Sequence, residues 1–145
     1  MDTALDLLHA KPTALVAAAA DMTVLEAADL MNRHGIGSLL VLEGRRLVGI
    51  FTERDVLRRV VAEALSPRHT LVAAVMTRDV ICCAADTPVD DLAELMRSRR
   101  IRHLPVVDAN SDVIGVVSIG DVNAHRFTSC AVALHQVQDY VFRRA

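Results

Sequence analysis

The feature that most constrains the fold of this chain is an internal repeat. Residues 21–42 align without a gap with residues 86–107, and residues 49–55 align with residues 115–121. A duplicated segment of this length is typical of two copies of one supersecondary unit, neither of which can bury its apolar face alone. The sequence therefore predicts two similar halves that share a core.

Hydrophobic periodicity predicts the order β-α-β-β-α in each copy, which is a mixed α+β fold. In the first copy, after a short leading helix at residues 6–9 that ends by Pro12, we expect strands at residues 14–18, 38–42 and 47–51 and helices at residues 23–34 and 52–65. In the second copy, we expect a short helix at residues 72–76, strands at residues 80–84, 104–107 and 113–117, a helix that starts at Thr87, and a last helix that starts at Ser118.

Capping residues and apolar stripes support these helices. Thr23 followed by Glu26 predicts one helix start. In the second copy, Thr87 is the expected N-cap, with Pro88 at the first helical position and Asp90 completing the capping box. The expected core stripes are Val24, Ala27, Ala28 and Met31; Leu57, Val60, Val61 and Ala64; and Val89, Leu92, Ala93 and Met96.

The repeated motif that carries most chemistry follows the last strand of each copy. Thr52 is followed three residues later by Asp55, and Ser118 by Asp121. A hydroxyl and an acid at this spacing form a capping box, which is one interpretation. A strand that ends in a helix N-terminus also exposes free N–H groups beside the hydroxyl and the carboxylate. The second interpretation is a corner that binds a phosphate and a ribose, and the motif alone leaves both open.

Composition favours a globular protein without a general affinity for polyanions. Of 145 residues, 52% are hydrophobic, which is enough to fill a core. A formal net charge of -2 and a pI near 6.3 give no drive toward nucleic acid or an anionic membrane. The apolar run at residues 15–20 is too short to span a bilayer, and the N-terminus lacks a basic leader. We expect a cytoplasmic protein with no nucleic-acid or membrane partner.

No constellation of residues suggests catalysis or a metal site. The three cysteines are Cys82, Cys83 and Cys130, an odd number that we expect to stay reduced. The histidines show no metal-ligand spacing among themselves or with the cysteines. The serines lack a nucleophile elbow, and neither repeated aspartate has a second carboxylate at catalytic spacing. We expect no enzymatic activity, no metal and no required cofactor.

With these residues the chain resembles a tandem pair of cystathionine-β-synthase (CBS) domains, often called a Bateman module. The most specific motifs are Val-Met-Thr at residues 75–77, Ile-Arg-His-Leu-Pro-Val-Val-Asp at residues 101–108, and the two hydroxyl-x-x-Asp motifs. The resemblance implies a free-standing protein whose two domains pack about a pseudo-twofold axis. The implied divisions are residues 6–65 for the first domain, 66–127 for the second and 128–145 for an extra C-terminal helix.

The resemblance also implies where a ligand binds. CBS pairs commonly bind adenosine-containing ligands, such as AMP, ADP, ATP, NAD or S-adenosylmethionine, in two clefts between the domains. By resemblance, Asp55 and Asp121 hold ribose hydroxyls, Thr52 and Ser118 contact phosphate or ribose, Thr77, Val80 and Ile101 line the base, and Arg102 and His103 face phosphates. Simpler explanations stay open, because the acids also serve as caps and the histidine suits a core. Most of the arginine cluster at residues 97–102 suits a solvated surface, which leaves Arg102 as its phosphate candidate.

The first copy departs from the family pattern. Where the second copy has Arg-His at residues 102–103, the first has Gly-Ser at residues 37–38. The cleft of the first copy should therefore offer fewer charged donors to a polyphosphate, although Arg54 can partly substitute. We expect the cleft with Ser118 and Asp121 to be occupied if only one is.

Two functions remain in competition at this stage. The first is a regulatory module that binds an adenine nucleotide and signals to an unidentified partner protein through the angle between its halves. The alternative is a ligand-independent dimerisation module with vestigial clefts. Cys130, Leu134, Val137 and Val141, with Tyr140 beside them, form a helical stripe that has no counterpart in the repeat. We expect a homodimer to which this helix contributes.

Overall fold

The computed structural model describes residues 2–11 and 15–143, with side chains described as far as Gln138. The expected end of the leading helix at Pro12 and the expected strand start at Ala14 lie outside the described residues. The same holds for the side chains of Tyr140 and Val141 in the predicted C-terminal stripe.

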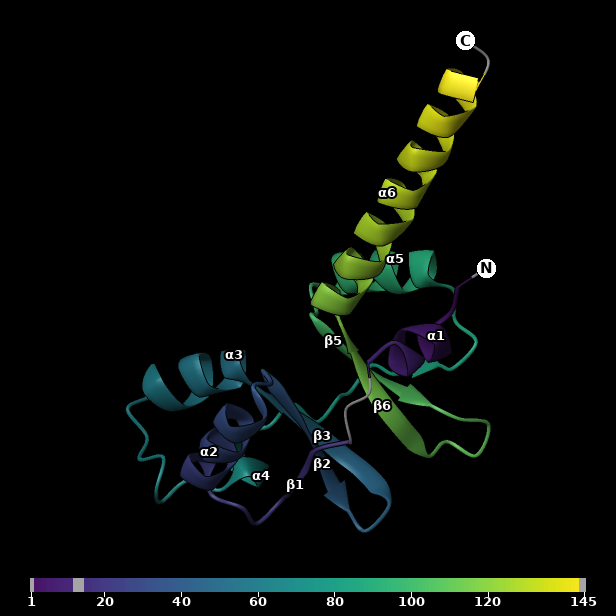
Figure 1. The fold of residues 1–145 in the computed structure, drawn as a ribbon. Helices are drawn as coiled ribbons and strands as arrows, with labels where there is room; N and C mark the ends of the chain where they lie inside the picture. The colour runs from purple at the N-terminus through teal and green to yellow at the C-terminus, as the bar shows by residue number, and fades with distance from the viewer. Residues whose placement is uncertain (1, 12–14, 144–145) are drawn as a thin grey trace.

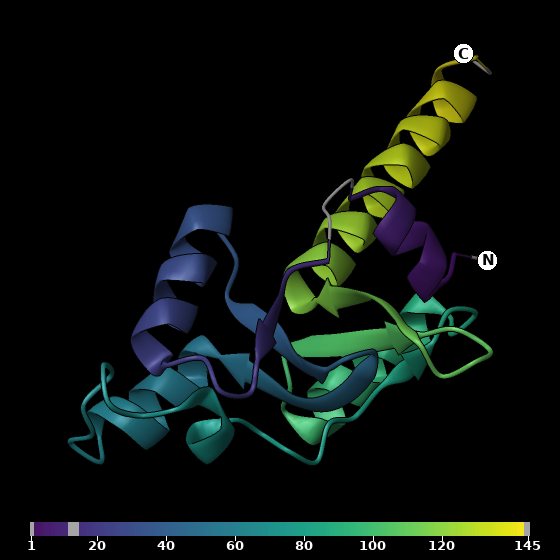
Figure 2. The ribbon, with the colours of Figure 1, turned by 90° about the horizontal axis from the view of Figure 1, so that it is seen from below.

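The structure consists of two similar halves that meet through their sheets (Figure 1, Figure 2). The first half comprises α1 (Ala4–His9), β1 (Ala17–Ala19), α2 (Val24–His34), β2 (Ser38–Glu43), β3 (Arg46–Thr52), α3 (Glu53–Asp55) and the π-helix η1 (Val56–Val61). The second half comprises α4 (Val72–Val75), β4 (Cys83–Ala84), α5 (Val89–Arg99), β5 (His103–Val107), β6 (Val113–Ser118) and α6 (Ile119–Arg143). The predicted class, mixed α+β with two repeated β-α-β-β-α units, is confirmed.

Each half contains a three-stranded sheet with the same pairing. The first strand runs parallel to the second, and the third runs antiparallel to the second. The register is repeated as well, because Ser38 pairs with Thr52 in one sheet and His103 pairs with Ser118 in the other. This register places the start of β2 or β5 beside the motif hydroxyl that ends β3 or β6.

The two leading helices, α1 and α4, are exchanged between the halves. Ala4 of α1 is fully buried in the core of the second half, and Val72 of α4 is fully buried in the core of the first. Equivalent backbone hydrogen bonds hold them: the Ala4 N–H donates to the Thr87 carbonyl at 2.8 Å, and the Val72 N–H donates to the Met22 carbonyl at 2.8 Å. In Figure 1, α1 lies beside β6, and α4 contacts β3 and η1 of the first half. Neither core is therefore complete without the other half of the chain.

The start of α2 agrees with the sequence prediction, but the start of α5 does not. Thr23 Oγ1 accepts a hydrogen bond from the Glu26 N–H at 3.2 Å. The N-cap of α5 is Pro88 rather than Thr87, and it makes no side-chain capping bond. Pro88 occupies the repeat position of Thr23, the N-cap of α2, and a proline has no hydroxyl with which to cap a helix. The predicted capping box with Asp90 is therefore wrong, and Asp90 instead accepts a hydrogen bond from Arg126 at 3.0 Å.

The helix predicted for residues 52–65 forms with a different geometry. After the short helix α3, the chain continues as η1, where the Ala62 N–H donates to the Leu57 carbonyl and the Leu65 N–H donates to that of Val60. These bonds to the fifth preceding residue widen the turn and rotate the side chains that follow. Only Val60 of the predicted stripe is buried, while Leu57 and Val61 are both 62% exposed. The predicted stripe is therefore wrong.

Other differences concern element length. β1 is shifted to residues 17–19, and β4 has two residues where five were expected, because only Cys83 and Ala84 pair with β5. The predicted closing helix and C-terminal helix are one continuous element, α6, with no break at Thr128. None of the helices in the described part of the chain is long and apolar enough to cross a membrane.

Each exchanged helix brings residues against one glycine of the other sheet, Gly49 or Gly115, and this gives a matched pair of glycine-to-alanine substitutions. A Cβ on Gly49 would lie 2.5 Å from Met76 Sδ and 2.9 Å from the Thr77 carbonyl oxygen, whereas a Cβ on Gly115 would meet only the end of the Leu8 side chain, at 2.7 Å. The Thr77 carbonyl is part of the backbone and cannot move aside, whereas the end of the Leu8 side chain can rotate away. We expect Gly49→Ala to lower the free energy of unfolding by about 1–3 kcal/mol and Gly115→Ala to be close to neutral. Denaturant titration of both variants tests this, and equal losses would contradict it.

Candidate functional site

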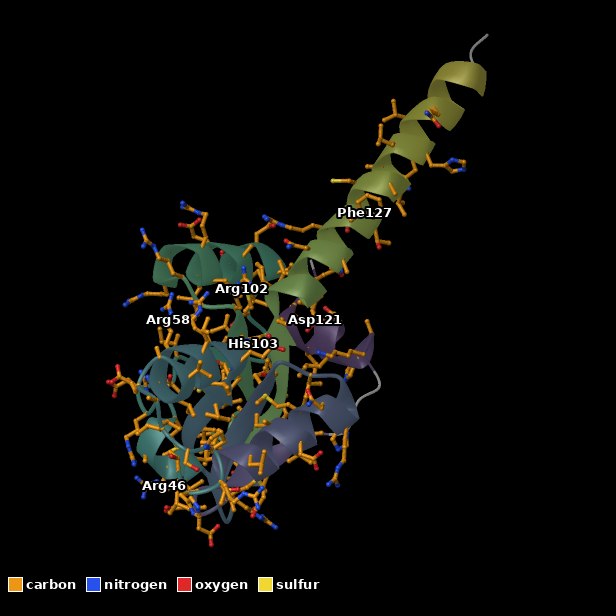
Figure 3. The ribbon with its side chains drawn as sticks, turned by 90° about the vertical axis from the view of Figure 1, so that its left-hand side faces the viewer. Arg46, Arg58, Arg102, His103, Asp121 and Phe127 are labelled. Atoms are coloured by element: carbon orange, nitrogen blue, oxygen red, sulfur yellow. The ribbon has the colours of Figure 1, made fainter. Side chains whose placement is uncertain are left out.

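Two cavities open between the halves, and each is lined by residues from both. The larger, of about 600 Å³, is lined by Leu8, Lys11, Leu15, Val16, His34, Gly35, Ile36, Gly37, Ser38, His103, Ile114, Gly115, Val116 and Ser118. The smaller, of about 220 Å³, is lined by Gly37, Ile50, Thr52, Glu53, Arg54, Asp55, Thr77, Arg100, Ile101, Arg102 and His103. Figure 3 shows Arg102, His103 and Asp121 near the centre of the molecule, below the free part of α6.

The smaller cavity brings together most of the residues singled out in the sequence. Its first wall is the motif of the first half, Thr52, Arg54 and Asp55. Facing it are the predicted residues of the second half that line the same cavity, namely Thr77, Ile101, Arg102 and His103. The sequence analysis placed the cation of residue 102 with the motif of its own copy. The structure corrects this, because Arg102 lines the cavity of the other copy's motif and not the cavity that holds Ser118.

The carboxylate of Asp55 is already engaged by the protein. Asp55 is only 6% exposed, and its Oδ2 accepts hydrogen bonds from the Thr52 N–H at 3.0 Å and the Thr52 hydroxyl at 3.2 Å. Its Oδ1 accepts from the Thr77 hydroxyl at 3.2 Å, and Arg59 Nε lies 3.8 Å away. The capping interpretation therefore holds for Asp55, and a ribose would have to displace the Thr77 hydroxyl.

Asp121 is also a cap, but its environment differs. Its Oδ2 accepts the Ser118 N–H at 2.8 Å, and the Asp121 N–H donates to Ser118 Oγ at 3.1 Å. Lys11 Nζ forms an ion pair with the same Oδ2 at 3.2 Å. Among the residues that the structure describes, both hydrogen bonds to the Asp121 carboxylate reach Oδ2, so Oδ1 faces no protein donor. Asp121 itself lines neither cavity, but its partners Lys11 and Ser118 both line the larger one.

Lys11 is the functional candidate that the sequence analysis missed. It is the only lysine of the chain, and it lies 110 residues from Asp121 in sequence. No local pattern could indicate this pair, because it depends on the exchange that brings α1 onto the second half. Its ammonium group places a cation at the larger cavity, where the sequence analysis expected Arg102.

The internal repeat could have predicted which residues of one half face the hydroxyl-x-x-Asp motif of the other half. Residues 37–38 occupy the position in the first copy that residues 102–103 occupy in the second. The backbone shows this equivalence, since the Glu53 N–H donates to the Gly37 carbonyl at 3.1 Å and the Ile119 N–H donates to the Arg102 carbonyl at 2.8 Å. A twofold arrangement then places residues 37–38 in the cleft of the other motif, which is where they lie.

The smaller cavity is rich in charged groups of both signs. Arg54 reaches across the halves, and its guanidinium donates to the Arg100 carbonyl at 3.2 Å. The Glu53 carboxylate covers Gly37, since a Cβ there would lie 3.0 Å from Glu53 Oε1. Arg102 adds a further guanidinium, a group that suits phosphate recognition. A phosphate in this cavity would meet three arginines, Arg54, Arg100 and Arg102, and two opposing carboxylates, Glu53 and Asp55.

His103 lines both cavities and therefore lies between them. Burial between the two halves lowers the pKa of this imidazole below its ordinary value, with Lys11 and Arg102 acting in the same direction and Glu53 and Asp121 against it. At neutral pH the ring is uncharged. It can donate one hydrogen bond to a phosphate, but it does not offer the full positive charge of an imidazolium.

The remaining candidates carry less chemistry. Val80 lines neither of these two cavities, so the structure does not place it with the other predicted site residues. Burial raises the pKa of the Cys83 thiol to about 11, which keeps it protonated and unreactive. The part of the chain that the structure describes holds no group of three or more His, Cys, Asp or Glu side chains that could bind a metal ion.

The family model of the CBS domain matches this chain twice, at residues 12–62 and 72–126. These two matches cover most of the chain and coincide with the two repeated units of the fold. The chain therefore belongs to the family of CBS-domain proteins, and the resemblance noted in the sequence is confirmed.

Curated relatives support this assignment. The CBS domain-containing protein YhcV of Bacillus subtilis is 32% identical over 109 residues, which cover 75% of this chain and 76% of YhcV. The mitochondrial CBS domain-containing protein CBSX3 of Arabidopsis thaliana is 40% identical over 107 residues, covering 70% of this chain. The chain spans about half the length of CBSX3 and of a relative from Methanopyrus kandleri that is 37% identical.

Solved structures share the fold. A putative signal-transduction protein with CBS domains from Burkholderia ambifaria superimposes with a TM-score of 0.84 at 36% identity, covering 88% of this chain and 95% of that chain. A CBS-domain protein of Pyrobaculum aerophilum, solved in complex with AMP, has a TM-score of 0.74 at 28% identity and covers 83% and 89%. The CBS pair of protein MJ0100, in complex with 5′-methylthioadenosine and S-adenosylmethionine, has a TM-score of 0.76 at 26% identity and covers 89% and 98%.

The lowered pKa of His103 predicts a pH dependence of stability. The unfolded chain binds a proton on this ring at a higher pH than the folded chain, so acidification favours unfolding. The contribution of His103 is fully present above the ordinary histidine pKa near 6.5, and it is lost as the pH falls through the lower folded value. We expect the free energy of unfolding to fall below pH 6.5 and His103→Gln to flatten that fall.

The control for this prediction is His69→Gln, which changes an exposed histidine. Denaturant titrations between pH 7.5 and pH 5 would be compared for the parent protein and the two variants. If His103→Gln and His69→Gln follow the same pH profile as the parent, the burial of the His103 ring does not control this dependence.

Proposed function

We propose that this protein is a regulatory module that binds an adenosine-containing nucleotide between its two CBS domains. The observation that carries the proposal is the composition of the smaller cavity. A helix N-terminus with Thr52 and Asp55 faces Arg102 and His103 of the other half across one cleft. Helix N-termini and guanidinium groups favour phosphates, and carboxylates favour ribose hydroxyls. The AMP and S-adenosylmethionine complexes of related CBS pairs support the same ligand class.

We infer that the larger cavity fills first. Its volume of about 600 Å³ lies within the roughly 300–1,000 Å³ of typical small-molecule sites, whereas the smaller cavity, at about 220 Å³, lies below it. The larger cavity also combines the Ser118 motif with the ammonium of Lys11. In this proposal, a phosphate in the larger cavity attracts Lys11 away from Asp121 Oδ2, and this movement opens the Asp121 carboxylate, which lines neither cavity in this structure, to the ribose.

Ligand occupancy would act through the relative position of the halves. Because each cavity has walls from both halves, a bound nucleotide draws those walls together and changes the angle between the domains. We propose that an unidentified protein partner responds to this angle, and that the chain itself is not a catalyst. We further propose that the protein is cytoplasmic, since Cys82, Cys83 and Cys130 are all free thiols, which a reducing compartment maintains.

We also propose that the protein forms a homodimer, with α6 contributing to the interface. Phe127 is 76% exposed and Leu134 is 64% exposed, so this helix presents apolar surface that no other described part of the chain covers. The alternative function is a dimerisation module whose clefts bind nothing. The same exposed helix favours that alternative equally, so only ligand binding separates the two functions.

The test is a thermal-shift panel of AMP, ADP, ATP, NAD, S-adenosylmethionine and 5′-methylthioadenosine. A ligand at 100 times its Kd stabilises the folded state by about 2.7 kcal/mol, which is readily measured for a protein of this size. We expect at least one phosphate-bearing ligand to raise the melting temperature. No shift with any ligand at millimolar concentration would favour the dimerisation module.

The panel becomes specific for the site when it is repeated on Lys11→Met. Removing the ammonium should weaken AMP binding by about tenfold or more, because a charge-assisted hydrogen bond to phosphate contributes on the order of 1.5–3 kcal/mol. It should leave 5′-methylthioadenosine, which has no phosphate, nearly unaffected. Lys11→Arg, which keeps the charge, is the control. Equal weakening of both ligands would show that Lys11 does not contact the phosphate.

A further inference from the structure

The part of α6 beyond Phe127 extends away from the body of the molecule (Figure 1, Figure 3). The first turns of α6 pack against α5, α1 and β6, and Val122 is fully buried there. Every described residue from Arg126 to Gln138 is exposed. Helices of this length depend on the packing of an apolar face, and a helix segment without such packing is marginal in water. Thr128 and Ser129, which are weak helix formers, add to this dependence.

The exposed segment has one apolar stripe with coiled-coil spacing. Phe127, Cys130, Leu134 and Val137 follow one another in alternating steps of three and four residues. This is the spacing of the seam positions of a coiled coil, in which two helices pack side chains into each other's holes. In the sequence, Val141 continues the same steps. We call the four described residues, Phe127, Cys130, Leu134 and Val137, the α6 seam.

Charge indicates which partner the α6 seam fits. Residues 127–138 contain no Asp, Glu, Lys or Arg, so this surface offers no ion pair to a charged partner and no fixed charge that repels an identical helix. The seam is self-complementary in spacing, and twofold symmetry lets the same residues serve both sides of the contact. Phe127, 76% exposed, is the largest side chain of the seam and would bury most area.

From this geometry we propose that the α6 seam pairs with the α6 seam of a second copy of this chain, forming a two-stranded coiled coil. The inference rests on the proposed homodimer and assigns its interface to α6. It places Cys130 inside the contact, although this thiol is exposed in the single chain.

The chain offers a matched control for this proposal. Leu134 of the seam is 64% exposed, and Val132 is 51% exposed. Val132 lies on the opposite face of the helix, about 180° from the middle of the seam. The test therefore compares Leu134→Lys, in the seam, with Val132→Lys, outside it. Both add one charge to the same exposed segment, and the thermal unfolding of each variant confirms that the body of the protein stays folded.

The first measurement is the mass in solution by light scattering at micromolar concentration. We expect the parent and Val132→Lys to have twice the 15.8 kDa of one chain, and Leu134→Lys to have the mass of one chain, with dimer affinity reduced at least a hundredfold. A second measurement is the alkylation rate of Cys130, which should be slow in the two dimers and at least tenfold faster in Leu134→Lys.

Each contrary result has a definite meaning. A parent protein with the mass of one chain would overturn both this inference and the proposed homodimer. A dimer that survives Leu134→Lys, with Cys130 still alkylated quickly in the parent, would overturn only the α6 seam and leave a dimer through another face. Loss of the dimer in both lysine variants would also overturn the seam, because the effect would not depend on the face of the helix.

Discussion

The exchange of α1 and α4 between the two halves is the interaction on which the rest of the structure depends. Each helix precedes one sheet in sequence and completes the core of the other. Burial of their apolar side chains stabilises both halves at once, so neither half has a finished core without its partner. The exchange also fixes the Ile50–Thr77 backbone pair, with both hydrogen bonds at 2.9 Å, between β3 and the segment that leaves α4.

The exchange also explains why the two cavities differ although the sequence is repeated. In the smaller cavity, the segment after α4 supplies Thr77, whose hydroxyl satisfies Asp55 without adding charge. In the larger cavity, the segment after α1 supplies Lys11, whose ammonium pairs with Asp121. The exchanged segment thus gives Asp55 a neutral donor, with Arg59 of the following helix 3.8 Å away, and gives Asp121 a cation. The ammonium of Lys11 lines the larger cavity and can exchange the Asp121 carboxylate for a ligand phosphate, which is why we infer that the larger cavity fills first.

Most of the fold was predictable, because the repeat and the apolar periodicity report local structure and the faces that are buried. The errors have different causes. Thr87 and Asp90 suggested an N-cap one residue too early for α5, although the repeat aligns Pro88 with Thr23, the N-cap of α2. The π-helical turn of η1 turned Leu57 and Val61 out of the core although their spacing suits an α-helix. The motifs identified the candidate site, but the Lys11–Asp121 pair joins residues too distant for any sequence pattern to connect.

The central claim is that the cavities between the halves bind an adenine nucleotide, and the most direct measurement is an amide NMR titration with AMP. The account predicts shift changes at Gly37, His103 and Ser118, which line the cavities from both halves. It predicts none at Gly44, in the hairpin turn between β2 and β3, nor in α6 beyond Phe127. Spectra that stay unchanged at millimolar AMP, or changes confined to the exposed arginines of α5, would contradict the claim.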